Sequence, residues 1–101
     1  MHQPKHLLIG GLVAMGFDCT GKFLLTASHS GRGLFSTDAW ERVARDTQPA
    51  YPTEGKALGI GPIEGQVIEV IQRDEAQERI ELRSPDGKHL LVGESDGITI
   101  Q

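Results

Sequence analysis

The sequence has little cysteine and few aromatic residues. Cys19 is its single cysteine, so the chain can form neither an internal disulfide nor a metal site built from several thiolates. A lone thiol is typical of proteins from the reducing cytoplasm, which is where we expect this chain. Aromatic residues make up only 5% of the 101 residues. With so few large side chains, we expect one modest core and a single domain over residues 1–101.

Basic residues are also outnumbered by acidic ones. Ten Lys and Arg against 14 Asp and Glu give a formal net charge of −4. A chain of this charge repels a phosphate backbone at long range, so we expect no nucleic-acid partner. A protein partner with a basic surface fits better, although a charge of this size also simply keeps a small domain in solution.

Apolar runs are too short to cross a bilayer. Residues 7–15 (LLIGGLVAM) form one such run, and a membrane-spanning helix needs about 20 apolar residues. The alternative is a signal peptide, but Asp18 directly before Cys19 does not fit a lipoprotein cleavage site. We therefore interpret the run as a buried strand and expect no contact with a membrane.

Glycine and proline divide the chain into short apolar segments. The 13 glycines and five prolines fall mostly between these segments, which is typical of an all-β protein. Gly10, Gly11 and Gly16 lie within the first segment, where they favour a bent strand or two strands separated by a kink. The predicted strands cover residues 7–17, 22–28, 34 to about 36–38, 66–72, 78–83, 89–93 and 98–100.

Three segments carry particular expectations. Residues 38–46 (DAWERVARD) show helical spacing through Trp40 and Val43, but they also suit a strand, which we favour. Residues 47–62 are rich in glycine and proline, and we expect a long loop of the kind that often carries function. Residues 66–72 (QVIEVIQ) are apolar on both faces, so they are expected to form a central strand.

One pattern occurs twice, 66 residues apart. Residues 18–31 and 84–97 each contain a turn, a Gly-Lys pair, two leucines, a short polar stretch and a turn glycine. This pattern resembles the blade of a WD-type β-propeller, in which a turn such as Ser-Pro-Asp-Gly-Lys precedes an apolar strand. The resemblance implies two blade-like antiparallel meanders, with a strand at residues 40–45. A ring needs at least four blades, so two must pack on each other as a small sandwich or an open barrel.

The sequence contains no pattern that predicts catalysis. Its histidines, which include His6, His29 and His89, do not fall at the spacing of metal ligands. Ser28 precedes His29, but neighbours in a strand point to opposite faces and cannot form a catalytic triad together. The glycine-containing segments lack the Lys-Ser or Lys-Thr pair of a phosphate-binding loop. We expect no enzyme activity and no cofactor; a small hydrolase with an unrecognised site is the weakest interpretation.

Several residues are candidates for contacting a protein partner. Trp40 and Tyr51 are amphipathic aromatics of the kind enriched at interfaces, although for Trp40 a place in the core is the favoured alternative. Asp74 and Glu75 lie in a predicted polar hairpin, for which a solvated tip is the favoured interpretation, although exposed acids there could also enter a cleft. The predicted partner-binding residues are His29, Arg32, Trp40, Tyr51, Glu64, Asp74 and Glu75.

The chain as a whole resembles the small cytoplasmic immunity proteins encoded beside secreted bacterial toxins, including those of type VI secretion systems. The resemblance lies in residues 21–33 (GKFLLTASHSGRG), 40–46 (WERVARD) and 51–66, with its GIGPIEGQ run. It implies an inhibitor that covers the active site of a cognate toxin and performs no chemistry itself. An acidic inhibitor suits a toxin cleft that accepts an anionic substrate such as NAD or nucleic acid. The alternative is a propeller-like structural or adaptor module within a larger assembly.

Overall fold

The computed structural model describes residues 4–47 and 51–101, and it confirms the all-β prediction. The fourth histidine, His2, lies outside the described residues. The strands are β1 (Lys5–Leu8), β2 (Leu12–Phe17), β3 (Phe23–Ser28), β4 (Gly31–Ser36), β5 (Arg42–Arg45), β6 (Lys56–Leu58), β7 (Val67–Glu69), β8 (Ile71–Gln72), β9 (Ile80–Arg83), β10 (Leu90–Glu94) and β11 (Gly97–Ile100), with a 3-10 helix η1 at Gly61–Ile63. Among the described residues, no helix has the length and apolar character needed to cross a membrane.

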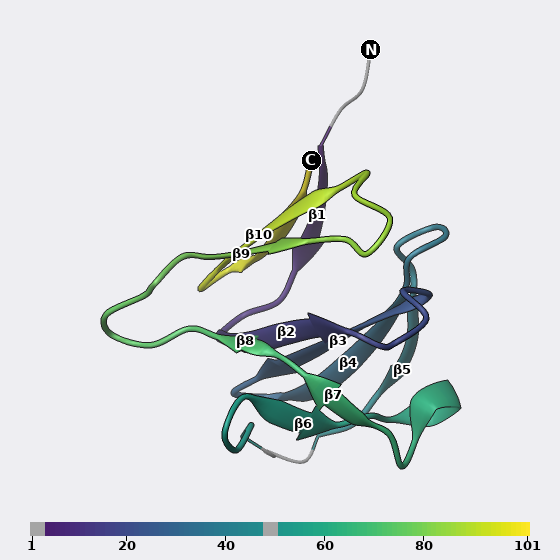
Figure 1. Cartoon of the computed structure of the whole chain (residues 1–101). Helices are drawn as coiled ribbons and strands as arrows, with labels where there is room; N and C mark the ends of the chain where they lie inside the picture. Colours follow the sequence, from purple (N-terminus) through teal and green to yellow (C-terminus); the bar gives the residue numbers. More distant parts are fainter. Residues whose placement is uncertain (1–3, 48–50) are drawn as a thin grey trace.

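The strands are arranged in three layers (Figure 1). The upper sheet has the order β1-β11-β10-β9, the middle sheet has the order β5-β4-β3-β2-β8, and β6 pairs with β7 below them. Among the described strands all pairings are antiparallel, and no sheet closes on itself. Of the two expected architectures, the stacked layers therefore correspond to the small sandwich.

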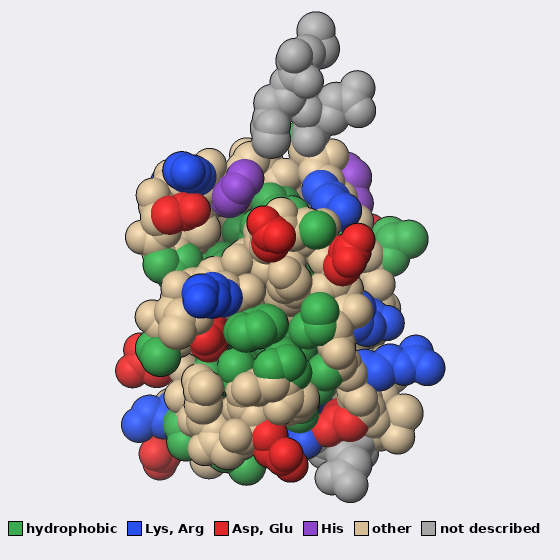
Figure 2. Space-filling model, turned by 90° about the vertical axis from the view of Figure 1, so that its right-hand side faces the viewer, with side chains coloured by type: hydrophobic (Ala, Val, Ile, Leu, Met, Phe, Trp, Pro, Cys, Tyr) green, Lys and Arg blue, Asp and Glu red, His purple; other side chains and the backbone are tan. Residues whose placement is uncertain are grey.

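Apolar clusters on both faces of the middle sheet hold these layers together. Leu24 belongs to the cluster between the upper and middle sheets, while its neighbour Leu25 belongs to the cluster between the middle sheet and the lower layer. Neighbouring residues of a strand point to opposite faces, so β3 contributes to both clusters. The middle sheet is thus covered on both sides, which explains why residues 24–28 are all buried. At the surface, the face shown in Figure 2 carries acidic and basic side chains interspersed around a central group of hydrophobic ones.

The two sequence repeats fold into equivalent units. In the first unit Phe17 of β2 pairs with Leu24 of β3, and in the second Arg83 of β9 pairs with Leu90 of β10. Phe17 and Arg83 are 66 positions apart in the sequence, and so are Leu24 and Leu90. β4 and β11 then follow as the third strand of each unit. The repeat in the sequence is therefore a repeat in strand order and in register.

The turns that open the two units are also equivalent. The Asp18 carboxylate accepts a hydrogen bond from the Phe23 amide at 3.0 Å, and the Ser84 hydroxyl accepts one from the His89 amide at 3.0 Å. Within each turn a hydroxyl donates to a carboxylate, from Thr20 to Asp18 and, with the order of the two groups exchanged, from Ser84 to Asp86. Different side chains thus satisfy the same backbone groups.

The fourth strand of each unit has a different origin. β5 follows β4 directly and pairs with it, whereas β1, from the other end of the chain, pairs with β11. The first apolar segment consequently divides into β1 and β2, the two-strand alternative expected from its glycines. Gly11 lies in the bend between them with a φ of 71°, a conformation that glycine adopts without steric cost.

In the middle of the chain one expectation is confirmed and one is corrected. The strand favoured for residues 38–46 is confirmed over residues 42–45, which form β5 on the edge of the middle sheet. The alternative helix is wrong, because Trp40 has a φ of 57°, which no α-helix contains. The single central strand predicted over residues 66–72 is wrong. This segment forms two short strands: β7 pairs with β6 in the lower layer, and after Val70 β8 pairs with β2 at the edge of the middle sheet.

Two connections are more ordered than expected. The predicted loop over residues 47–62 contains β6 and most of η1. β4 begins at Gly31, three residues before the strand predicted from Leu34, and the turn that precedes it lies at His29 and Ser30.

Candidate partner-binding site

Four of the predicted partner-binding residues line one groove on the protein surface. His29 lies in the turn between β3 and β4, Tyr51 precedes β6, and Asp74 and Glu75 follow β8. Together they border a groove of about 530 Å³. Its remaining lining residues are Leu12, Val13, Arg73 and Glu78. The fold thus brings together residues from three separate parts of the sequence, and we call this feature the acidic groove.

His29 and Tyr51 form the aromatic side of the acidic groove. Tyr51 Oη lies 3.1 Å from His29 Nδ1, and the two rings meet edge to face with their centroids 5.9 Å apart. The His29 amide donates to the Gly11 carbonyl at 3.1 Å, which fixes the backbone at this turn. The Tyr51 residue nevertheless keeps 55% of its surface exposed. The pair is therefore held in position while much of the tyrosine remains available to a partner.

Arg73 fixes the opposite, acidic side of the groove. Its Nη1 donates to the Leu12 carbonyl at 2.6 Å, and its Nε donates to the Glu78 carbonyl at 2.5 Å. The acidic turn between Arg73 and Glu78 is closed by Asp74 and Gln77, whose backbone groups exchange two hydrogen bonds of 3.1 Å. One arginine therefore ties both ends of the acidic turn to the first strand of the middle-sheet unit.

The acidic groove has a net negative charge. Asp74, Glu75 and Glu78 outnumber Arg73, which is the one arginine or lysine of its lining. In the part of the chain that the structure describes, the ion pairs are Arg32 with Asp46 and Arg79 with Glu81, so these three carboxylates are not engaged in one. Such a surface complements a basic protein surface, and exposed charges of this kind raise association rates.

Arg32, another predicted partner-binding residue, lies outside the acidic groove and is engaged within the chain. Its Nη2 lies 2.5 Å from Asp46 Oδ2, and its side chain is only 13% exposed. Its Nη1 donates to the Leu58 carbonyl of β6 at 3.0 Å. Arg32 thus connects the middle sheet to the lower layer.

Trp40 and Glu64, the last two predicted partner-binding residues, are also distant from the acidic groove. Trp40 is half-buried and packs against the cluster between the upper and middle sheets, edge to face with His89 at a centroid distance of 5.7 Å. Its placement against the core agrees with the alternative that we favoured for it. Glu64 is exposed directly after η1, where its amide donates to the Gly61 carbonyl at 3.0 Å.

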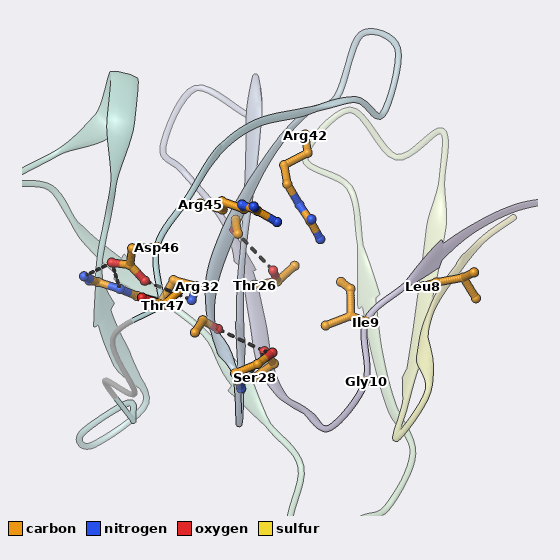
Figure 3. Close-up of a pocket in the computed structure, with 13 residues that line it drawn as sticks. Leu8, Ile9, Gly10, Thr26, Ser28, Arg32, Arg42, Arg45, Asp46 and Thr47 are labelled. Atoms are coloured by element: carbon orange, nitrogen blue, oxygen red, sulfur yellow. Dashed lines mark hydrogen bonds and ion pairs between the residues drawn. The ribbon is translucent and has the colours of Figure 1, made fainter.

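A second pocket contains residues that sequence reasoning missed. It opens between the upper and middle sheets with a volume of about 300 Å³, and Arg42 and Arg45 of β5 project toward it (Figure 3). No motif in the sequence marks these two arginines, because their common orientation depends on an irregularity in the pairing of β5. We call this feature the inter-sheet pocket.

The described residues include no group of three or more histidine, cysteine, aspartate or glutamate side chains arranged to hold a metal ion. Cys19 is exposed in the turn before β3.

Asp86 has a perturbed pKa. A hydrogen bond from the Ser84 hydroxyl is the main cause and one from the Lys88 amide is the second, and both lower the pKa below the ordinary value of 3.8. Both bonds lie within the turn that opens the second unit, so this shift belongs to the fold.

Comparison with the models of known protein families, with curated proteins and with solved structures gives no match to this chain.

Proposed function

We propose that this chain is a non-catalytic protein-binding module, and that its partner is a bacterial toxin whose active site it covers. The observation that carries the proposal is the acidic groove, where an exposed aromatic residue and three carboxylates from separate parts of the sequence share one surface. Interfaces of high affinity combine an aromatic anchor with surrounding polar groups in this way. An immunity protein of the bacterial cytoplasm fits this description.

The charge of the acidic groove supports a partner with a basic cleft. A toxin that acts on an anionic substrate, such as NAD or a nucleic acid, needs cationic groups where the substrate binds. Asp74 and Glu75 would lie against those groups and occupy the place of the substrate. Because Arg73 anchors the acidic turn at both ends, little conformational entropy would be lost when the turn is bound.

A structural or adaptor module is the second candidate function. The two equivalent units, each with four strands, favour it, because repeated units commonly serve as platforms for assembly. The two candidates differ in the cell. An immunity gene lies directly beside a toxin gene, and its deletion is lethal unless that toxin is inactivated. An adaptor gene has neither property.

The decisive experiment measures inhibition of the toxin encoded beside this gene. The purified chain should abolish the toxin's activity at equimolar concentration. Replacing Tyr51 with Ala should weaken binding at least about tenfold, as expected for loss of an aromatic anchor. The double variant D74N/E75Q should slow association and reduce its dependence on salt concentration.

Asp38→Asn is the matched control for these variants. Asp38 is an exposed acidic residue that follows β4, whereas His29 precedes β4, so the two lie at opposite ends of that strand. The control should bind the toxin as tightly as the unmodified chain. Viability of the deletion strain, or equal binding by the Tyr51→Ala variant and the control, would contradict the proposal.

A further inference from the structure

We infer that the inter-sheet pocket binds a small oxyanion, a carboxylate or phosphate group, between Arg42 and Arg45. The pocket lies between residues 8–10, which connect the upper sheet to the middle one, and strands β3 to β5 (Figure 3). It is separate from the acidic groove: the two features share no lining residue. The inference is therefore independent of the proposed function.

A β-bulge places the two arginines on the same face of β5. Gly33 pairs with Arg45 and Leu34 with Ala44, but Phe35 pairs with Arg42, so the register shifts and Val43 has no partner. In a regular strand, residues three positions apart point to opposite faces. The extra residue restores a common direction, and bulges often redirect side chains beside functional sites.

Gly33, which has no side chain, lines the inter-sheet pocket. A Cβ added at Gly33 would lie 3.0 Å from Thr26 Oγ1 and 3.6 Å from Arg42 Nε, so glycine leaves space where these groups converge. The Arg42 guanidinium lies 5.2 Å from the centroid of the Phe35 ring, which holds it against the strand. The cationic group is thus positioned before a ligand arrives.

The charges of the inter-sheet pocket are unbalanced. Arg32 also lines it, but Asp46 neutralises Arg32 through their ion pair. Arg42 and Arg45 form no ion pair with any carboxylate in the described part of the chain. In a protein of net charge −4, two such guanidinium groups at one pocket form a local positive site. Because each guanidinium presents paired N–H donors, carboxylate and phosphate oxygens are its best ligands.

The size of the inter-sheet pocket limits the ligand. A volume of about 300 Å³ accommodates a small molecule or one terminal group of a larger one. Ile9 lines the pocket together with the arginines, and its side chain points toward them (Figure 3), so an apolar portion next to the anionic group would also find contacts. A short-chain carboxylic acid or a small phosphate monoester meets both conditions.

Nuclear magnetic resonance titration with simple anions tests this inference. Inorganic phosphate and sodium acetate are added in separate experiments at pH 7, and sodium chloride of equal ionic strength serves as the salt control. We expect saturable shifts in the amide signals of residues 31–33 and 42–45 and in the side-chain Nε signals of Arg42 and Arg45. The tighter of the two anions identifies the ligand as phosphate-like or carboxylate-like.

The double variant R42Q/R45Q should weaken anion binding at least about tenfold, since it removes two charge-assisted donors. Arg83→Gln is the matched control, because Arg83 is an exposed arginine of β9 that does not line the pocket. Arg42→Lys keeps the charge but loses the paired donors, so its affinity should lie between those of the unmodified chain and the double variant. Shifts that sodium chloride reproduces, or equal binding by R42Q/R45Q and Arg83→Gln, would overturn the inference.

Discussion

Gly31 and Gly97 occupy equivalent positions at the start of the third strand of each unit. Their φ angles are 134° and 149°, and a Cβ added to either would lie 2.0 Å from a carbonyl oxygen of the neighbouring outer strand or its end. For Gly31 that oxygen belongs to Asp46, and for Gly97 it belongs to Leu7. The two units therefore share the close approach of an outer strand to a glycine backbone, although one outer strand follows its unit and the other comes from the N-terminal segment.

Replacing Gly31 or Gly97 with Ala should lower the free energy of unfolding by about 2 to 4 kcal/mol, because the new methyl group meets backbone at a φ that alanine rarely adopts. Urea denaturation followed by tryptophan fluorescence measures the change. Gly10→Ala is the control, since an added Cβ at Gly10 has no atom within 4 Å. It should change stability by less than about 0.5 kcal/mol. Equal effects at Gly10 and Gly97 would show that the close approach is not a constraint.

Leu7 and Leu8 of β1 should differ sharply in their contribution to stability. Leu7 is 7% exposed and belongs to the cluster between the upper and middle sheets, whereas Leu8 is 85% exposed. Leu7→Ala should cost about 2 to 4 kcal/mol, as for other buried leucines, and Leu8→Ala should cost less than about 0.5 kcal/mol. Thermal unfolding monitored by circular dichroism compares the two. Similar losses from both substitutions would mean that β1 does not dock in this orientation.

The ion pair between Arg32 and Asp46 should matter more than the one between Arg79 and Glu81. In the Asp46→Asn variant the Arg32 guanidinium, whose side chain is only 13% exposed, keeps a neutral acceptor in place of a carboxylate. The free energy of unfolding should fall by about 1 to 2 kcal/mol. Glu81→Gln breaks a 3.4 Å contact between side chains that are both more than half exposed, so its effect should stay below about 0.5 kcal/mol. Urea denaturation of both variants provides the comparison. A larger effect at Glu81 would contradict this ranking.

The pKa of Asp86 should lie below 3.8, and Ser84→Ala should raise it toward that value by removing the principal hydrogen bond. Since folding lowers this pKa, the ionised carboxylate contributes stability above the ordinary pKa, and the contribution is lost as the pH falls through the lower, folded value. Titration of the carboxyl carbon by nuclear magnetic resonance measures both chains. Asp38, which lies outside this turn, provides a reference signal. An unchanged Asp86 pKa in the Ser84→Ala variant would contradict the assignment of the cause.

Local patterns predicted most of the strands. The turn over residues 84–87 combines a proline that presets φ with a glycine at positive φ, and β9 and β10 lie on either side of it as expected. The division of residues 66–72 into β7 and β8 could not be predicted in this way. It depends on which distant strands are available for pairing, β6 below and β2 in the middle sheet, and strand propensity does not encode the partner.

The acidic groove and the inter-sheet pocket also differ in how far the sequence predicts them. The sequence indicates His29, Tyr51, Asp74 and Glu75 through their chemistry and their places in turns or irregular segments, and such segments commonly lie at the surface. Arg42 and Arg45 were missed because their common orientation requires the unpaired Val43, and a bulge is visible only once β4 and β5 are paired.

The pairing of β1 with β11 has a consequence for biosynthesis. Lys5 lies opposite Ile100, so β1 is synthesised long before its pairing partner β11. At common translation rates the delay is on the order of 5 to 20 seconds, while a local hairpin forms in microseconds. The first unit can therefore assemble on the nascent chain, but residues 5–8 must wait with Leu7 uncovered until their template emerges. That interval is when the newly made protein is most exposed to proteases and to association with other chains.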